Sequence, residues 1–223
     1  MLERLDDALW VAAAPQTFLG MHLGTRMTIV RRDDGGLVVH SPIALDDRLR
    51  GEVDALGPVR CVIAPSLFHH LYVGEWIAAF PDVRLVGPKK LADKREDLKL
   101  DATLAETPDP AWQGTLDQVR IRGCMLQETV FFHPPSRTLI SADLIENFES
   151  SPHWPTRMYL KMSGVHGKPG VSRPVRWTFR DHEQAKLAIE RVLLWDFQRL
   201  VLAHGNVIEA HGPQVVRESY AWL

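Results

Sequence analysis

The strongest structural signal in this sequence is the stretch Val-Ile-Ala-Pro-Ser-Leu-Phe-His-His-Leu-Tyr-Val-Gly-Glu-Trp, residues 62–76. It begins in an apolar strand predicted at 61–64, which ends at a Pro-Ser pair because proline offers no ladder N–H and both residues favour turns. Two adjacent histidines, His69 and His70, precede an amphipathic helix predicted at 74–80. Imidazoles between a buried strand and a helix occupy the position where α/β proteins place their chemistry.

The residues before this stretch begin with antiparallel strands. Apolar residues predict strands at 9–13, 25–31 and 37–40, and an Asp-Asp-Gly-Gly turn joins the last two. A helix is predicted at 44–56, where a Gly-Pro pair ends it. After the two histidines, a strand at 84–86 and a charged helix at 88–97 continue the alternation of strands and helices. This order predicts a sheet covered by helices on its faces.

The second half of the chain repeats the mixture of strands and helices. Residues 148–174 are rich in proline and glycine, and we expect an irregular loop there that covers the functional site. Asp181 is expected to cap the helix that follows. The other predicted elements are strands at 119–121, 128–132, 138–142 and 200–203 and a closing helix at 214–222.

The composition excludes several classes of protein. The 223 residues carry a formal net charge of −2 and have no basic stripe, which argues against a nucleic-acid partner. No apolar run approaches the length of a membrane span, and the first twenty residues do not form a signal peptide. Cys61 and Cys124 form no CxxC pair or disulfide framework, so a reducing compartment is the default. We therefore expect a cytoplasmic protein that acts on a small molecule.

Residues suited to metal binding stand at the ends of three predicted strands. His69 and His70 follow the first, His133 and Asp143 bracket a hairpin, and His204 ends the last strand. Imidazole and carboxylate together suit a divalent metal, with zinc as the first choice and iron or manganese as alternatives. Side chains at several strand ends are typical of a site built at one edge of a sheet.

The chain resembles the metallo-β-lactamase superfamily, and more narrowly an uncharacterised family of that fold, over nearly its whole length. The resemblance implies an α/β (α+β) fold, an αββα four-layer sandwich formed by one domain over residues 1–223. It also implies that Asp143 is the metal-bridging aspartate and His204 the last metal-binding histidine. It depends on Leu-Val-Val-His-Ser-Pro (37–42), Ala-Pro-Ser-Leu-Phe-His-His-Leu-Tyr-Val-Gly-Glu-Trp (64–76), Phe-Phe-His-Pro-Pro-Ser-Arg-Thr-Leu-Ile-Ser-Ala-Asp-Leu (131–144) and Leu-Val-Leu-Ala-His-Gly (200–205).

The chain also departs from the superfamily's His-x-His-x-Asp-His motif. Alignment on Gly74 leaves only His70 as a plausible ligand among the four motif positions, and His69 falls beside them. The histidine expected near Gly123 is absent, although His133 or Glu128 could substitute for it. In addition, His40 replaces the acidic residue that usually ends the preceding strand. These departures argue against a standard dizinc site and leave open a mononuclear site, a rearranged site or no metal.

Two main functions follow from these observations, and a redox-active iron site is a third option. The first is a metal-dependent hydrolase with His69, His70, His133, Asp143 and His204 as candidate ligands, of which Asp143 and His70 are also candidate catalytic residues. The second is a metal-free binding or scaffolding protein that keeps the fold, since most positions of the ligand motif are lost. The fold alone does not distinguish them.

Overall fold

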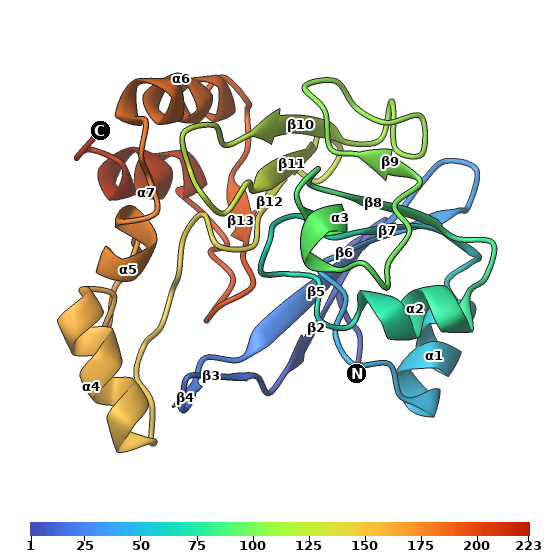
Figure 1. Ribbon diagram of the computed structural model, residues 1–223, viewed down its shortest axis with the longest axis horizontal. Helices are drawn as coiled ribbons and strands as arrows, with labels where there is room; N and C mark the ends of the chain where they lie inside the picture. Colours follow the sequence, from blue (N-terminus) through green and yellow to red (C-terminus); the bar gives the residue numbers. More distant parts are fainter.

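The computed structural model describes residues 1–223 and contains two main β-sheets that pack face to face (Figure 1). The larger sheet has the strand order β1-β2-β5-β6-β7-β8-β9, and the smaller has the order β10-β11-β12-β13. The strands of the larger sheet are β1 (Glu3–Asp6), β2 (Leu9–Ala14), β5 (Thr25–Arg31), β6 (Leu37–His40), β7 (Val59–Ile63), β8 (Arg84–Gly87) and β9 (Ala102–Thr103). Those of the smaller are β10 (Asp117–Arg120), β11 (Thr129–His133), β12 (Thr138–Ile140) and β13 (Arg199–Val201).

Alternating side chains of the strands fill two different layers of the core. In β6, Val38 packs between the two sheets in one cluster with Phe131 of β11, whereas Val39 packs on the outer side in one cluster with Trp76. Successive side chains of a strand point to opposite faces, so a strand that is apolar at every position is buried on both sides. All four residues of β6 are buried, as this arrangement requires.

Helices cover the outer face of each sheet. The first group lies over the larger sheet and consists of α1 (Asp47–Asp54), α2 (Val73–Ala79) and α3 (Leu91–Lys94). The second lies over the smaller sheet, at the opposite side of Figure 1, and consists of α6 (His182–Val192) and α7 (Gly212–Ser219). The predicted αββα four-layer sandwich is therefore confirmed. No helix of the chain is both long and apolar enough to span a bilayer.

The prediction of an irregular loop over residues 148–174 is wrong in part, because this segment contains α4 (Trp154–Ser163) and the start of α5 (Arg173–Arg176). Pro155 stands in the first turn of α4, where a missing N–H costs no hydrogen bond. Gly164 ends this helix in the left-handed conformation, with φ of 86°. The proline and glycine that indicate a loop in the sequence thus mark the start and the end of a helix.

Other elements differ from the prediction mainly in length. The helix predicted at 44–56 is shorter in the structure, where it forms α1. The Asp46 carboxylate accepts a hydrogen bond from Leu49 N at 2.7 Å, so α1 begins after Asp46. Asp181 caps α6 in the same way, as predicted. Strand β1 and a small hairpin of β3 (Thr17–Phe18) and β4 (Met21–His22) were not predicted. This hairpin contacts α4, because Thr156 Oγ1 accepts a hydrogen bond from His22 N at 2.8 Å.

Candidate metal centre

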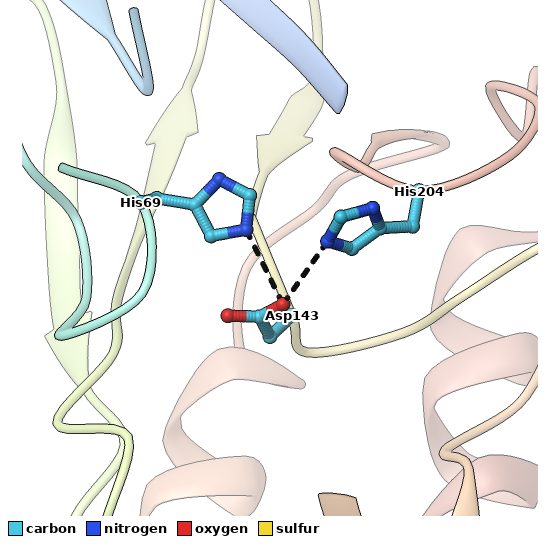
Figure 2. A group of neighbouring side chains, drawn as sticks. All are labelled: His69, Asp143 and His204. Atoms are coloured by element: carbon cyan, nitrogen blue, oxygen red, sulfur yellow. Dashed lines mark hydrogen bonds and ion pairs between the residues drawn. The ribbon is translucent and has the colours of Figure 1, made fainter. Parts of the chain in front are cut away.

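Three of the predicted ligands, His69, Asp143 and His204, converge at one edge of the sandwich (Figure 2). His69 lies in the loop between β7 and α2, and the other two follow β12 and β13. These two strands are parallel neighbours, so the residues after them emerge at the same edge of the sheet. The potential ligand atoms of the three residues all lie within 4.8 Å of one another.

The two imidazoles contact the same carboxylate oxygen. Nε2 of His69 and Nε2 of His204 each lie 3.3 Å from Asp143 Oδ1. Two ligand atoms bound about 2.1 Å from a tetrahedral ion are separated by about 3.4 Å. The two separations from Asp143 Oδ1 therefore match those of ligands that share one cation, and the third is no more than 4.8 Å.

The outer nitrogen of each imidazole has its own partner. His204 Nδ1 lies 2.8 Å from the carbonyl oxygen of Gly24, and His69 Nδ1 lies 2.8 Å from Ser41 Oγ. A carbonyl oxygen only accepts, so His204 Nδ1 must carry the proton of this hydrogen bond. In neutral His204, Nε2 then carries a lone pair that faces the Asp143 carboxylate. This contact is stable only if a proton or a metal ion lies between the nitrogen and the carboxylate oxygen. Such outer partners are typical of metal-binding histidines.

The carboxylate of Asp143 is fixed by its surroundings. Glu128 accepts hydrogen bonds from the backbone N–H groups of Ala142 at 2.7 Å and of Asp143 at 3.2 Å, and Ser66 Oγ lies 3.4 Å from Asp143 Oδ2. Burial acts to raise the pKa of Asp143, but the adjacent imidazoles of His69 and His204 hold it well below its usual range. Burial, followed by the negative charge of Asp143, raises the pKa of Glu128.

The donor set meets the requirements of a mononuclear site. Two imidazole nitrogens and one carboxylate oxygen suit zinc, and iron or manganese accept the same ligands. Three protein ligands leave a coordination position open for water or substrate, as in catalytic zinc sites. The residues present thus form a candidate three-residue metal site.

Two predicted ligands lie outside this group. His133 is at the far end of the β11–β12 hairpin, where it pairs with Thr138 and its Nδ1 lies 2.7 Å from Ser136 Oγ. His70 is outside the group of three, with Nδ1 3.1 Å from Arg95 Nη1, and it lines the adjacent cavity. Burial and the nearby Lys94 and Arg95 lower the pKa of His70 to about 4. The structure therefore brings three of the five predicted ligands together and leaves His70 and His133 outside that group.

Ser41 and Gly24 were not predicted from the sequence, although their oxygen atoms contact the outer nitrogens of the two imidazoles. Ser41 follows β6 directly, and its position before a proline at a strand end was a usable signal. Gly24 contributes only its carbonyl oxygen, which no side-chain pattern can indicate. His40, in the place of the expected acidic residue, is buried with its ring against Phe131 and with neither ring nitrogen hydrogen-bonded. It is not part of the group of three.

A cavity of about 410 Å³ opens next to the three residues. His69, Asp143 and His204 form one side of it. Its other walls combine apolar and polar side chains, among them Phe18, Leu23, Phe68, Tyr72, Glu146 and Tyr159. A cavity of this size holds a small molecule, and its position places that molecule against the candidate metal ligands.

The two adjacent histidines provide a direct test of the site. We expect His69→Ala to lower zinc affinity by about 100-fold or more because it removes a ligand, and His70→Ala to change it less than about threefold. The measurement is competition of each variant with a chromophoric zinc chelator, with His182→Ala as the surface control. Equal losses for the two substitutions would contradict the assignment of His69 alone.

Comparisons with known proteins agree with this fold. Residues 6–91 match the family described as "Domain of unknown function (DUF4336)", and no curated protein matches the chain. A metallo-beta-lactamase from Pontibacter korlensis is 14% identical with a TM-score of 0.68, and 99% of this chain and 98% of that chain are covered. The metallo-beta-lactamase FIM-1 from Pseudomonas aeruginosa, in a mono-zinc form, is 10% identical with a TM-score of 0.66 over 100% and 95% of the two chains. A metallo-beta-lactamase from Hirschia baltica is 12% identical with a TM-score of 0.68, and 99% of this chain and 96% of that chain are covered. The chain therefore has the metallo-β-lactamase fold.

Proposed function

We propose that this protein is a metal-dependent hydrolase whose single divalent ion, zinc in the first place, is bound by His69, Asp143 and His204. The observation that carries the proposal is the pair of 3.3 Å contacts from two imidazole Nε2 atoms to one carboxylate oxygen, with both Nδ1 atoms bound elsewhere. An ion bound in such a site polarises a carbonyl or phosphoryl oxygen and lowers the pKa of a bound water.

The residues around the site have separate roles in this proposal. Gly24 and Ser41 hold the imidazoles in one orientation, which keeps both Nε2 atoms directed at the same point. Ser66 contacts the second oxygen of Asp143, which orients the carboxylate. His70 lines the cavity and is placed to hydrogen-bond a substrate there. The apolar walls restrict access of bulk water to a bound substrate.

The proposal is tested with protein stripped by a chelator and reloaded separately with zinc, iron(II) or manganese. We expect zinc to raise the rate of hydrolysis of at least one of a p-nitrophenyl ester, a γ-lactone and a bis-p-nitrophenyl phosphodiester by about 100-fold or more. The control is the same protein without metal. A protein that binds none of the three metals would contradict the proposal and support the alternative of a metal-free binding protein.

A further inference from the structure

Glu146 is a buried acidic residue that the metal centre does not explain. It lies in the segment after β12, and its side chain is outside the group of three potential ligands. Its backbone is fixed on both sides, because Glu146 N donates to Gly170 O at 2.9 Å and Gly170 N donates to Glu146 O at 2.9 Å. The residue is only 5% exposed, so its carboxyl group has been removed from bulk water.

The carboxyl group of Glu146 lacks the partners that burial normally demands. Glu146 lines the cavity beside His204 and Tyr159, and its Oε2 atom is buried without a hydrogen-bond partner. Burial raises the pKa of this carboxyl group, and the negative charge of Asp143 acts in the same direction, whereas the adjacent Ser172 and His204 oppose this shift. A buried carboxyl oxygen without a donor is costly, and such atoms concentrate at functional sites. The missing donor is therefore expected to come from a ligand in the cavity.

No basic side chain of the cavity is free to supply this donor. Lys94 is the one lysine or arginine that lines the cavity, and its Nζ atom donates to Leu67 O at 2.6 Å and lies 5.0 Å from the centre of the Phe68 ring. Tyr159 lines the same wall, but no hydrogen bond links it to Glu146. The imidazole of His204 lies close enough to act on the charge of Glu146, but its two nitrogens already face Asp143 and Gly24, so Oε2 of Glu146 stays without a donor.

We propose that Glu146 is a substrate-binding residue that accepts hydrogen bonds from a protonated amine. This inference rests on the proposed hydrolase function in one respect, namely that the same cavity receives the substrate. The substrate class is then a carboxylic ester, amide or lactone that also carries an ammonium group. The hydrolysable carbonyl lies toward His69, Asp143 and His204, and the apolar part of the molecule lies against Phe18 and Leu23.

The test uses metal-free protein and binding alone, so that its result does not depend on hydrolysis. The probes are 2-phenylethylammonium and 2-phenylethanol, which share a phenyl group and differ in charge. Their dissociation constants are measured by NMR titration at pH 7.5. We expect the wild type to bind the ammonium probe about tenfold more tightly than the alcohol, and Glu146→Gln to reduce this preference to less than about twofold.

The control is Glu149→Gln, because Glu149 belongs to the same segment but is exposed and contacts Asn206 rather than the cavity. It is expected to keep the wild-type preference. Glu146→Gln is also expected to melt no lower than the wild type, because the substitution removes a buried charge. No ammonium preference in the wild type, or an equal preference in Glu146→Gln, would overturn the inference. If the preference depends on Glu146 but no metal is bound, only the hydrolase proposal fails.

Discussion

Asp143→Asn is expected to remove tightly bound zinc from the protein. The wild type should bind one zinc ion per chain, and the variant fewer than about 0.1 under the same conditions, since a direct ligand and its negative charge are lost together. The effect is large because Asp143 is the common partner of both histidines, and the nearby Glu146 lies outside the group of three potential ligands. Glu128 is already occupied by two backbone N–H groups.

The measurement combines metal analysis by mass spectrometry with thermal denaturation. Zinc in excess raises the melting temperature of a protein that binds it only when folded, so the shift should be present in the wild type and absent in Asp143→Asn. Asp196→Asn is the matched control, because the Asp196 side chain is 83% exposed and pairs only with Arg137 at the surface. Retention of one zinc per chain by folded Asp143→Asn would place the metal elsewhere.

The positions of Asp143 and His204 could be predicted because local sequence determines both. Each residue follows a short apolar strand, and two such strands that lie parallel release their next residues at the same edge. Strand β5 was predicted with its observed bounds for a similar reason, since the Asp-Asp-Gly-Gly turn follows its apolar residues. These inferences needed only the periodicity of the strands and the chemistry of the turns.

The choice between His69 and His70 could not be made from the sequence. It depends on contacts between distant segments, since Ser41 holds His69 from the end of β6 and Arg95 holds His70 from the end of α3. The predicted hairpin was enough to exclude His133 from the group that contains Asp143. In the structure His133 pairs with Thr138, five residues before Asp143, which is about 16 Å along an extended strand. A residue next to the hairpin turn cannot reach the opposite end of the same hairpin.

Gly205→Ala is expected to destabilise the protein by about 3 kcal/mol or more and to disrupt the metal centre of any folded fraction. Gly205 has φ of 91°, and an added Cβ atom would lie 2.0 Å from the carbonyl oxygen of Asn147 and 2.4 Å from its carbonyl carbon. Both are backbone atoms, so no side-chain rotation relieves the contact. Asn147 N also donates to His204 O at 3.0 Å, which ties the segment after Asp143 to the last histidine. A methyl group here would separate two of the three ligands.

The matched control is Gly164→Ala at the end of α4. Gly164 has a similar φ of 86°, but an added Cβ atom would meet nothing within 4 Å. Gly164→Ala should lower the free energy of unfolding only by the cost of the left-handed backbone conformation, about 1–2 kcal/mol. The free energy of unfolding is measured by urea denaturation of the metal-free proteins, and zinc binding is measured on the folded variants. If Gly205→Ala lowers the free energy of unfolding no more than Gly164→Ala does, the close approach of residues 147 and 205 is not needed for stability. A larger loss accompanied by reduced zinc affinity is the expected result, because this contact fixes the distance between the strand ends that carry Asp143 and His204.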